Sequence, residues 1–402
     1  MVKEFLGFDF STVDRILFGA GTVGALPGLV RPWGQRFLVV TGRSAARVRP
    51  LVESLEAEGL EPRLLGVHGE PTVDTVTLGC RLATEQRVEG VVAFGGGSVI
   101  DAAKAIAVLA TNPGDVVEYL EIIGQGRPLE KPGLPCAAVP TTAGTGAEVT
   151  RNSVLASPEH RVKVSLRGRT LLPRLAIVDP ELSYGLPPEL TATTGLDALT
   201  QLVEPFVSCR ANPMTDALCR EGMRRIARSL RRAHAVAVRL AHDPEAKLDD
   251  SEKGARADLA LAALFGGVAL ANAGLGAVHG FAGPIGGMFG AAHGAICAAL
   301  LPTVTGGNVA ALRARHPDHP ALERYREVAA LLCDDAKATL EQGIDWMRRV
   351  TADLGITGLG QLGVADADLE SVVTRAEAAS SMKGNPVALT REEMGAILRA
   401  AL

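Results

Sequence analysis

The sequence has few cysteines, no excess of basic residues and no long apolar run. Its six cysteines include no CxxC pair, which favours reduced thiols in a cytoplasmic protein over a disulfide framework or a cysteine-ligated zinc site. Lys and Arg total 41 against 45 Asp and Glu and form no long basic block, so we expect no nucleic-acid partner. No segment reaches the roughly 18 uninterrupted apolar residues of a membrane-spanning helix, so we expect no membrane association. The amino terminus carries acids and lacks a continuous apolar stretch, unlike a secretory signal or a transit peptide.

The length of 402 residues exceeds the size at which one hydrophobic core usually stops growing, so we expect two domains. The first half alternates expected strands, at residues 36–40, 88–94 and 136–139, with expected helices, at residues 46–58 and 99–111. This order predicts a Rossmann-like domain with a parallel sheet, over residues 1–185. The second half contains long amphipathic stretches, at residues 214–238, 255–272, 321–332 and 369–383. They predict an all-helical domain over residues 186–402.

The first glycine turn, GAGTVG at residues 19–24, matches the GxGxxG pattern of dinucleotide-binding proteins. About twenty residues later, however, the chain has Gly42, Arg43 and Ser44 where that pattern expects an acid for the ribose. We therefore interpret residues 19–24 as a tight turn that needs small residues.

The second glycine turn, GGGS at residues 95–98, follows an apolar strand and opens a helix. Glycines let a pyrophosphate approach the backbone, and the amide end of the helix attracts its charge. We also expect Ser98 and Asp101 to form a helix cap, in the S-x-x-D pattern. The loop PTTAGTGAE at residues 140–148 follows the next strand and supplies hydroxyls and amides. The two segments together predict a nucleotide site.

Two of the eight histidines, His279 and His293, lie in an apolar, glycine-rich stretch, and a glycine follows each. A buried imidazole needs a partner, and the glycines are expected to clear space beside the rings. Asp197 and Gln201, in GLDALTQLVE, are four residues apart on one face of an expected helix, with Thr191 or Thr193 upstream as a cap. These four side chains could hold a divalent cation. They could equally form a hydrogen-bonded network without metal.

The chain resembles the iron-containing, group III alcohol dehydrogenases, which have the dehydroquinate synthase-like fold. The resemblance rests on GGGSVIDAAKAIA, PTTAGTGAEVT, GLDALTQLVE and VHGFAGPIGG followed by AAHGAICAALLP, in the family's order and over nearly the whole chain. It implies a Rossmann-like domain, a helical domain and an active site in the cleft between them. It also implies hydride transfer between NAD or NADP and a small alcohol or aldehyde, by an enzyme that is commonly a homo-oligomer.

The resemblance also implies residue roles. The expected pyrophosphate and ribose contacts are Gly95, Gly96, Gly97, Ser98 and Asp101, with Thr141, Thr142 and Thr145 on the facing loop and Lys163 near the ribose. The expected catalytic residues are Asp197, His279 and His293. These three and Gln201 occupy the positions of the family's metal ligands, for Fe²⁺ or Zn²⁺.

The chain departs from the family at three places. Gln201 replaces a histidine ligand, and an amide oxygen favours harder ions such as Mg²⁺ or Ca²⁺, so we expect weaker binding of iron or zinc. Gly283 replaces a histidine that lines the pocket, which predicts a roomier pocket and another route for the proton. Gly42 replaces the aspartate that repels the 2′-phosphate of NADP, so NADP is admitted and Arg43 or Ser44 could bind its phosphate.

We therefore expect an NAD(P)-dependent alcohol dehydrogenase or aldehyde or ketone reductase. One alternative is a metal-independent reductase of the maleylacetate type, for which Arg151 and Lys383 are candidate anion contacts. A lyase of the dehydroquinate synthase kind would need a larger basic set than we find. A third alternative is a non-catalytic nucleotide-binding relative whose metal site has been lost at Gln201.

Overall fold

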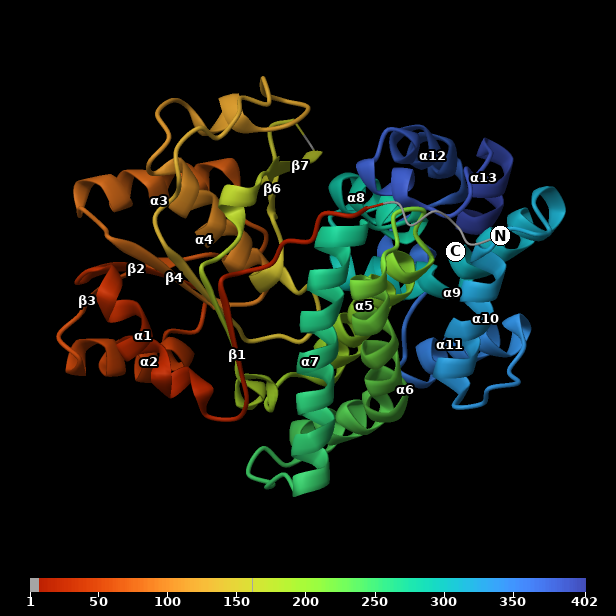
Figure 1. Ribbon diagram of the computed structural model, residues 1–402, viewed down its shortest axis with the longest axis horizontal. Helices are drawn as coiled ribbons and strands as arrows, with labels where there is room; N and C mark the ends of the chain where they lie inside the picture. The colour runs from red at the N-terminus through yellow and green to blue at the C-terminus, as the bar shows by residue number, and fades with distance from the viewer. Residues whose placement is uncertain (1–6, 161) are drawn as a thin grey trace.

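The computed structural model describes residues 7–160 and 162–402. A six-stranded parallel sheet forms the amino-terminal part, in the order β1-β8-β5-β4-β2-β3 (Figure 1). Its strands are β1 Arg15–Phe18, β2 Arg36–Thr41, β3 Glu61–Gly66, β4 Gly90–Gly95, β5 Cys136–Pro140 and β8 Leu175–Val178. The expected strands at 36–40, 88–94 and 136–139 are thus confirmed as β2, β4 and β5.

Helices cover both faces of this sheet, which makes three layers. They are α1 Leu26–Val30, α2 Ala45–Ala57, α3 Val73–Glu85 and α4 Gly97–Leu109. Alternate residues of β2 point to opposite faces, so Phe37 and Val39 pack with α1 and α2, whereas Leu38 and Val40 pack with α3 and α4. Both faces are covered by apolar side chains, as a parallel sheet requires.

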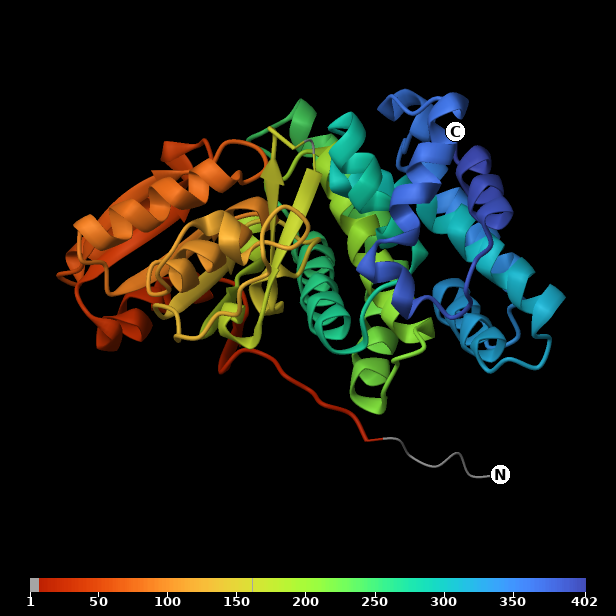
Figure 2. The ribbon, with the colours of Figure 1, turned by 90° about the horizontal axis from the view of Figure 1, so that it is seen from above.

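An antiparallel hairpin that the sequence analysis did not predict follows the 140–148 loop. Its strands are β6 Asn152–Ser157 and β7 Val162–Arg167. Figure 2 shows it in yellow between the sheet and the helices of the second half. It brings the first half of the chain against α8, where His279 lies.

The rest of the chain is helical, which confirms the predicted fold class. Its helices are α5 Pro188–Val207, α6 Pro213–His242, α7 Asp250–Ala273, α8 Ala277–Phe289, α9 His293–Arg315, α10 Ala321–Cys333, α11 Leu340–Asp353, α12 Leu369–Glu377 and α13 Arg391–Ala400. The expectation of one continuous helix over 369–383 is wrong: α12 ends at Glu377 and a 3₁₀ turn follows at Ser380–Gly384. At the end of this turn Gly384 lies against the Leu275 carbonyl, where a Cβ would lie 2.2 Å from the oxygen.

Helices α7 and α9 are long and apolar enough to cross a membrane by length and composition alone. Both are core helices, since 72% and 67% of their most apolar windows are buried inside the protein. Their apolar character is therefore explained by packing in the helical half.

Candidate functional site

Helix α5 carries Asp197 and Gln201 through the centre of the helical half. It packs against α6, α7 and α9, so its side chains are buried on nearly all sides, and Asp197 and Gln201 expose 1% and 2% of their surface. The predicted cap is wrong. The helix begins at Pro188, which suits its first turn, and Pro187 is the cap residue. Thr191 and Thr193 therefore lie inside the helix, where the Thr193 hydroxyl donates to the Glu189 carbonyl.

His279 and His293 both face Asp197. His279 lies in the first turn of α8, His293 is the first residue of α9, and their ring centroids are 5.3 Å apart. Their Nε2 atoms lie 3.5 Å and 3.7 Å from Oδ1 of Asp197. The glycines after them are sites of close packing, and the expectation that they clear space beside the rings stays a prediction. The Met382 side chain lies against Gly280, and the Thr193 backbone lies against Gly294. The second contact packs α9 closely on α5.

Glu204, two helical turns after Asp197, orients His279. Its Oε2 lies 2.6 Å from Nδ1 of His279, and its Oε1 accepts a 2.7 Å hydrogen bond from the Val278 amide. A carboxylate on Nδ1 fixes the ring and leaves Nε2 free to bind an ion. The sequence analysis missed this residue, although its seven-residue spacing from Asp197 on one helix face was a usable signal.

Cys297 completes the group, and the sequence analysis also missed it. It lies one turn after His293 on α9, is fully buried, and places Sγ 3.6 Å from Nε2 of His293 and 3.9 Å from Nε2 of His279. The four ligand atoms of Asp197, His279, His293 and Cys297 lie within 4.8 Å of one another. We call these four residues the buried cluster.

The charges in the buried cluster stabilise one another. Burial alone would raise the pKa of Asp197, but the His293 and His279 rings outweigh it and the pKa is lowered. Burial would likewise lower the pKa of His279, but the neighbouring Cys297 and Glu204 raise it well above its usual value. The neighbouring Cys297 is also the main cause that raises the pKa of His293.

The buried cluster fits a divalent cation. Oδ1 of Asp197 is buried, has no hydrogen-bond partner among the described residues and faces two imidazole nitrogens. A buried polar atom without a partner is costly, and a cation would satisfy it. The His293 side chain is 39% exposed, so the cluster is open to solvent on that side.

Gln201 is also close to Asp197, but its amide nitrogen faces the carboxylate. Nε2 donates a 2.9 Å hydrogen bond to Oδ2 of Asp197. The amide oxygen, the atom that a cation would need, is buried without a hydrogen-bond partner among the described residues. A Cβ at Gly266 of α7 would lie 3.6 Å from this oxygen.

The GGGS turn opens α4 as expected, but its cap differs from the prediction. The cap residue is Gly96, and no side chain caps the helix. Asp101 instead pairs with Lys104 at 3.0 Å and accepts a 3.0 Å hydrogen bond from the Val154 amide, so both carboxylate oxygens have protein partners. Its role as a cofactor contact stays a prediction.

The GGGS turn packs directly on the 140–148 loop. A Cβ at Gly97 would lie 2.7 Å from Oγ1 of Thr145, and one at Gly96 would lie 3.3 Å from Oγ1 of Thr142. Only glycine permits this approach. The loop also contacts the helical half, because a Cβ at Gly144 would lie 2.7 Å from Cβ of Thr194, three residues before Asp197. The expected nucleotide segments and the buried cluster are therefore neighbours.

The first glycine turn has a structural explanation. Asp179 accepts hydrogen bonds from the amides of Gly21 and Val23, and Gly21 has a φ of 73°. These amides are already occupied, which agrees with the interpretation as a tight turn.

The remaining expected cofactor contacts lie at the edges of this region. Gly42 follows β2, and a Cβ there would meet no atom within 4 Å; Arg43 and Ser44 are exposed. Lys163 on β7 pairs with Glu70 at 2.5 Å, and a Cβ at Gly286 of α8 would lie 2.7 Å from its Nζ. Gly283 of α8 also has open space at its Cβ position, in agreement with a roomier site.

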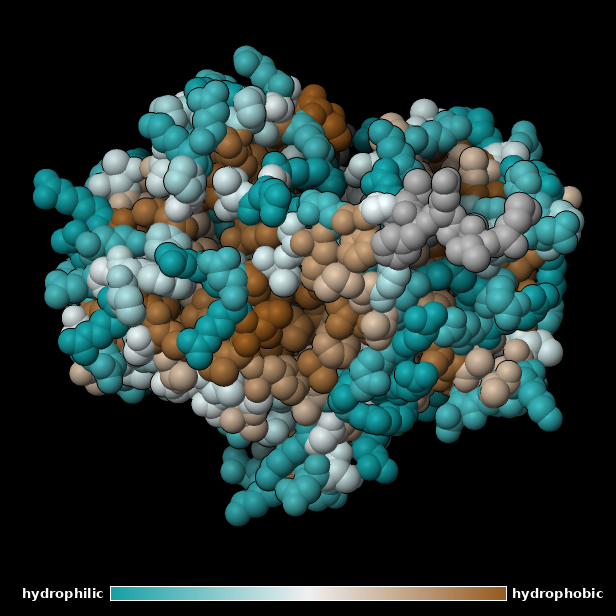
Figure 3. Space-filling view, in the orientation of Figure 1, coloured by the Kyte–Doolittle hydropathy of each residue, from teal (hydrophilic) through white to brown (hydrophobic). Residues whose placement is uncertain are grey.

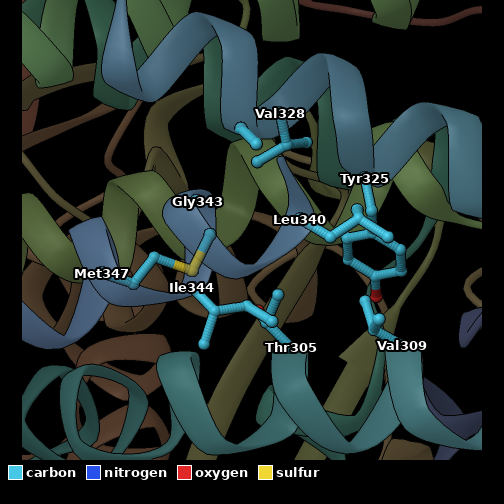
Figure 4. A pocket seen from close by; sticks show the side chains of 9 residues that line it. Thr305, Val309, Tyr325, Val328, Leu340, Gly343, Ile344 and Met347 are labelled. Atoms are coloured by element: carbon cyan, nitrogen blue, oxygen red, sulfur yellow. The ribbon is translucent and has the colours of Figure 1, made fainter. Parts of the chain in front are cut away.

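A small apolar cavity of about 10 Å³ lies elsewhere, between α9, α10 and α11 (Figure 4). Tyr325, Leu340 and Met347 are among its lining residues, and none of them belongs to the buried cluster. A cavity of this size holds about one water molecule. We assign it no role in ligand binding.

The 140–148 loop ends in a buried acid whose titration should change stability. Burial raises the pKa of Glu148 to about 7. Between its unfolded pKa near 4.5 and 7, the folded carboxyl holds a proton that the unfolded chain has lost, so its contribution falls as pH rises through this window. Glu148→Gln should raise the free energy of unfolding at pH 8, by up to about 3 kcal/mol, and leave it nearly unchanged at pH 4.

Urea unfolding at the two pH values measures this difference. Glu159→Gln, at an exposed position nearby, is the control and should show no such pH dependence. Equal effects of the Glu148 substitution at pH 4 and pH 8 would contradict the prediction.

Both halves of the chain match models of one protein family. The family model described as iron-containing alcohol dehydrogenase matches residues 14–180. The model described as the carboxy-terminal part of the Fe-containing alcohol dehydrogenase family matches residues 191–402.

Individual relatives agree with these matches. Alcohol dehydrogenase 4 of Saccharomyces cerevisiae is 36% identical, with 86% of this chain and 85% of the relative covered. The 1,3-propanediol dehydrogenase of Klebsiella pneumoniae is 34% identical, with 98% of each chain covered. A solved structure of a 1,3-propanediol oxidoreductase superposes with a TM-score of 0.89 at 32% identity, and covers 99% of this chain and 100% of its own.

Proposed function

Because the chain belongs to the iron-containing alcohol dehydrogenase family, we propose that its buried cluster and its GGGS turn act together in the NAD(P)-dependent interconversion of an alcohol and an aldehyde or ketone. The observation that carries this proposal is the convergence of Asp197, His279, His293 and Cys297 next to the loop that packs on the GGGS turn. One set of residues suits a cation and the other suits a dinucleotide.

Each group in the chain has a distinct task in this proposal. The amide end of α4 binds the pyrophosphate, and glycine at positions 96 and 97 lets the phosphate approach the backbone. Asp197, His279 and His293 would hold a divalent cation, which would supply a Lewis acid for the substrate oxygen. Glu204 keeps the His279 ring in the orientation that presents Nε2. Because Gly283 offers no side chain, the proton exchanges with solvent on the exposed side of His293.

The test is reduction of small aldehydes and ketones by the purified protein with NADH or NADPH. We expect nucleotide oxidation that stops after treatment with a chelator and returns when Fe²⁺ or Zn²⁺ is added. Unchanged activity in chelator would favour a metal-independent reductase of the maleylacetate type. Tight nucleotide binding without turnover under any condition would favour a non-catalytic relative.

Nucleotide preference depends on Gly42 in this proposal. Gly42→Asp should raise KM for NADPH about fivefold and leave KM for NADH unchanged, because a carboxylate a few ångströms from the 2′-phosphate repels it by about 1 kcal/mol in water. The open space at this position accepts the new side chain. Steady-state kinetics with both nucleotides measures the change.

Gly28→Asp is the matched control, since a Cβ at Gly28 of α1 also meets no atom within 4 Å. It should leave both KM values unchanged. An unaltered ratio of the two KM values in Gly42→Asp would place the 2′-phosphate away from Gly42 and contradict the prediction.

We also propose that the protein acts in the cytoplasm as a homo-oligomer. The edge strand β1 exposes apolar side chains, Ile16 by 39% and Phe18 by 36%. Figure 3 shows apolar residues gathered in the middle of this face, around β1. An exposed apolar sheet edge favours pairing with a second copy, and light scattering would give the mass in solution.

A further inference from the structure

We propose that Cys297, and not Gln201, is the fourth metal ligand, and that the resulting Asp-His-His-Cys site selects Zn²⁺ over Fe²⁺. This inference rests on the proposed function only in assuming that a divalent ion occupies the buried cluster. It reverses the expectation that the amide oxygen of Gln201 is a ligand and makes the site favour hard ions such as Mg²⁺ or Ca²⁺. It also assigns a ligand role to one of the six cysteines, although the lack of a CxxC pair disfavoured a cysteine-ligated zinc site.

The distances match a tetrahedral site. With Zn–N and Zn–O bonds of about 2.1 Å and a Zn–S bond of about 2.3 Å, neighbouring donor atoms lie about 3.3–3.6 Å apart. In the buried cluster, Oδ1 of Asp197 lies 3.5 Å and 3.7 Å from the two Nε2 atoms. Sγ of Cys297 lies 3.6 Å and 3.9 Å from the same nitrogens. These four donor pairs are within about 0.4 Å of the tetrahedral values, and the remaining two pairs lie within 4.8 Å.

Helix α9 supplies two of the ligands. His293 and Cys297 are four residues apart, so they project from the same face of the helix, one turn above the other. The packing of α9 on α5 at Gly294 brings this face to Asp197. Cys297 is fully buried, and the hydrogen-bond partners found for Sγ are the two imidazole nitrogens.

Gln201 has a different task in this arrangement. Its amide nitrogen holds Oδ2 of Asp197 at 2.9 Å, which orients the carboxylate so that Oδ1 faces the imidazoles. An amide that donates a hydrogen bond to a ligand acts as an orienting partner. The donor set is then one oxygen, two nitrogens and one sulfur, and a thiolate favours zinc, whereas a set with two oxygens favours harder ions.

Cobalt spectroscopy tests the assignment without turnover. The protein is stripped with a chelator and loaded with Co²⁺, and a near-ultraviolet thiolate-to-cobalt charge-transfer band is recorded. We expect this band in the wild type, in Gln201→Leu and in Cys219→Ser, and its loss in Cys297→Ser. Cys219→Ser is the matched control because Cys219 is also fully buried but lies on α6, outside the cluster.

Zinc competition with a chromophoric chelator gives the affinities. Loss of an orienting partner lowers metal affinity by about 10–100-fold, so loss of a ligand in Cys297→Ser should lower it by at least about 100-fold, and more than Gln201→Leu does. When equal amounts of Zn²⁺ and Fe²⁺ are offered, the ratio of bound Zn²⁺ to bound Fe²⁺ should be higher in the wild type than in Cys297→Ser, because thiolate favours zinc. A larger loss in Gln201→Leu than in Cys297→Ser would overturn the proposal.

X-ray absorption of the zinc-loaded wild type needs no variant, and it keeps the proposal testable if Cys297→Ser fails to fold. One sulfur neighbour at about 2.3 Å supports the proposal, and a shell of only nitrogen and oxygen overturns it. These readouts also separate the two proposals. A sulfur ligand in a protein that reduces no carbonyl compound would refute the proposed function alone, whereas metal-dependent reduction without a sulfur ligand would refute this inference alone.

Discussion

Asp197→Asn is expected to lower kcat/KM for aldehyde reduction by at least about 10³-fold and to remove most of the bound metal. The carboxylate is buried, its pKa is lowered, and its Oδ1 faces both imidazole rings. A neutral amide of the same shape cannot supply this charge to a cation. Lewis-acid assistance contributes several kcal/mol to such reactions, and each 1.36 kcal/mol corresponds to a tenfold change in rate.

Three measurements separate loss of the site from loss of the fold. Steady-state kinetics gives kcat/KM, elemental analysis gives metal per subunit, and NADH fluorescence gives the dinucleotide affinity. We expect the dinucleotide affinity to stay within about threefold of the wild type, because the GGGS turn belongs to the other half of the chain. A factor of three in affinity corresponds to only about 0.7 kcal/mol.

Thr200→Val is the matched control for Asp197→Asn. Thr200 lies on the same helix, is fully buried, and donates a 2.8 Å hydrogen bond to the Leu196 carbonyl. Its substitution should preserve both metal content and kcat. If Asp197→Asn keeps the metal and the rate while remaining folded, the buried cluster is not the catalytic centre.

Strongly periodic segments of the sequence predicted the fold well. Strands β2, β4 and β5 and helices α2 and α4 lie within a few residues of their expected positions, because apolar runs and glycine turns are local signals. The hairpin β6–β7 was missed, and the break after Glu377 was not visible in an amphipathic pattern that continues to Lys383. Both features depend on contacts with distant segments, at α8 and at Leu275.

The site was predicted in part. Asp197, His279 and His293 were selected because polar groups in apolar stretches need partners, and the structure brings them together. Cys297 was overlooked because a single cysteine carries no spacing signal of its own, and only its position one turn after His293 pointed to it. The orientation of Gln201 could not be read from the sequence, since an amide four residues from an acid can present either oxygen or nitrogen.

Lys104→Met is the second substitution with a large expected effect, a loss of about 3–5 kcal/mol in the free energy of unfolding. The ammonium group is fully buried and pairs with Asp101 at 3.0 Å. It also donates hydrogen bonds to Oγ1 of Thr150 and to the carbonyls of Ala147, Asn152 and Thr150. Methionine fills the same volume but removes the ammonium donor from these acceptors and leaves the Asp101 charge uncompensated.

Lys104 also ties the two expected nucleotide segments together. It belongs to α4, which the GGGS turn opens, while Ala147 lies in the loop that packs on Gly96 and Gly97 and Thr150 follows that loop. We therefore expect KM for the dinucleotide to rise in Lys104→Met at temperatures where the variant remains folded. Urea unfolding and steady-state kinetics measure the two effects. Lys131→Met, at an exposed position, is the control and should change neither.

A double variant distinguishes the buried charge from simple loss of packing. Lys104→Met combined with Asp101→Asn removes the uncompensated carboxylate and keeps an oxygen that can accept the Val154 amide. If the charge of Asp101 causes part of the damage, the double variant should be more stable than Lys104→Met by about 1–2 kcal/mol, because two residues in contact do not act independently. Additive losses would mean that the unpaired carbonyls, and not Asp101, determine the cost.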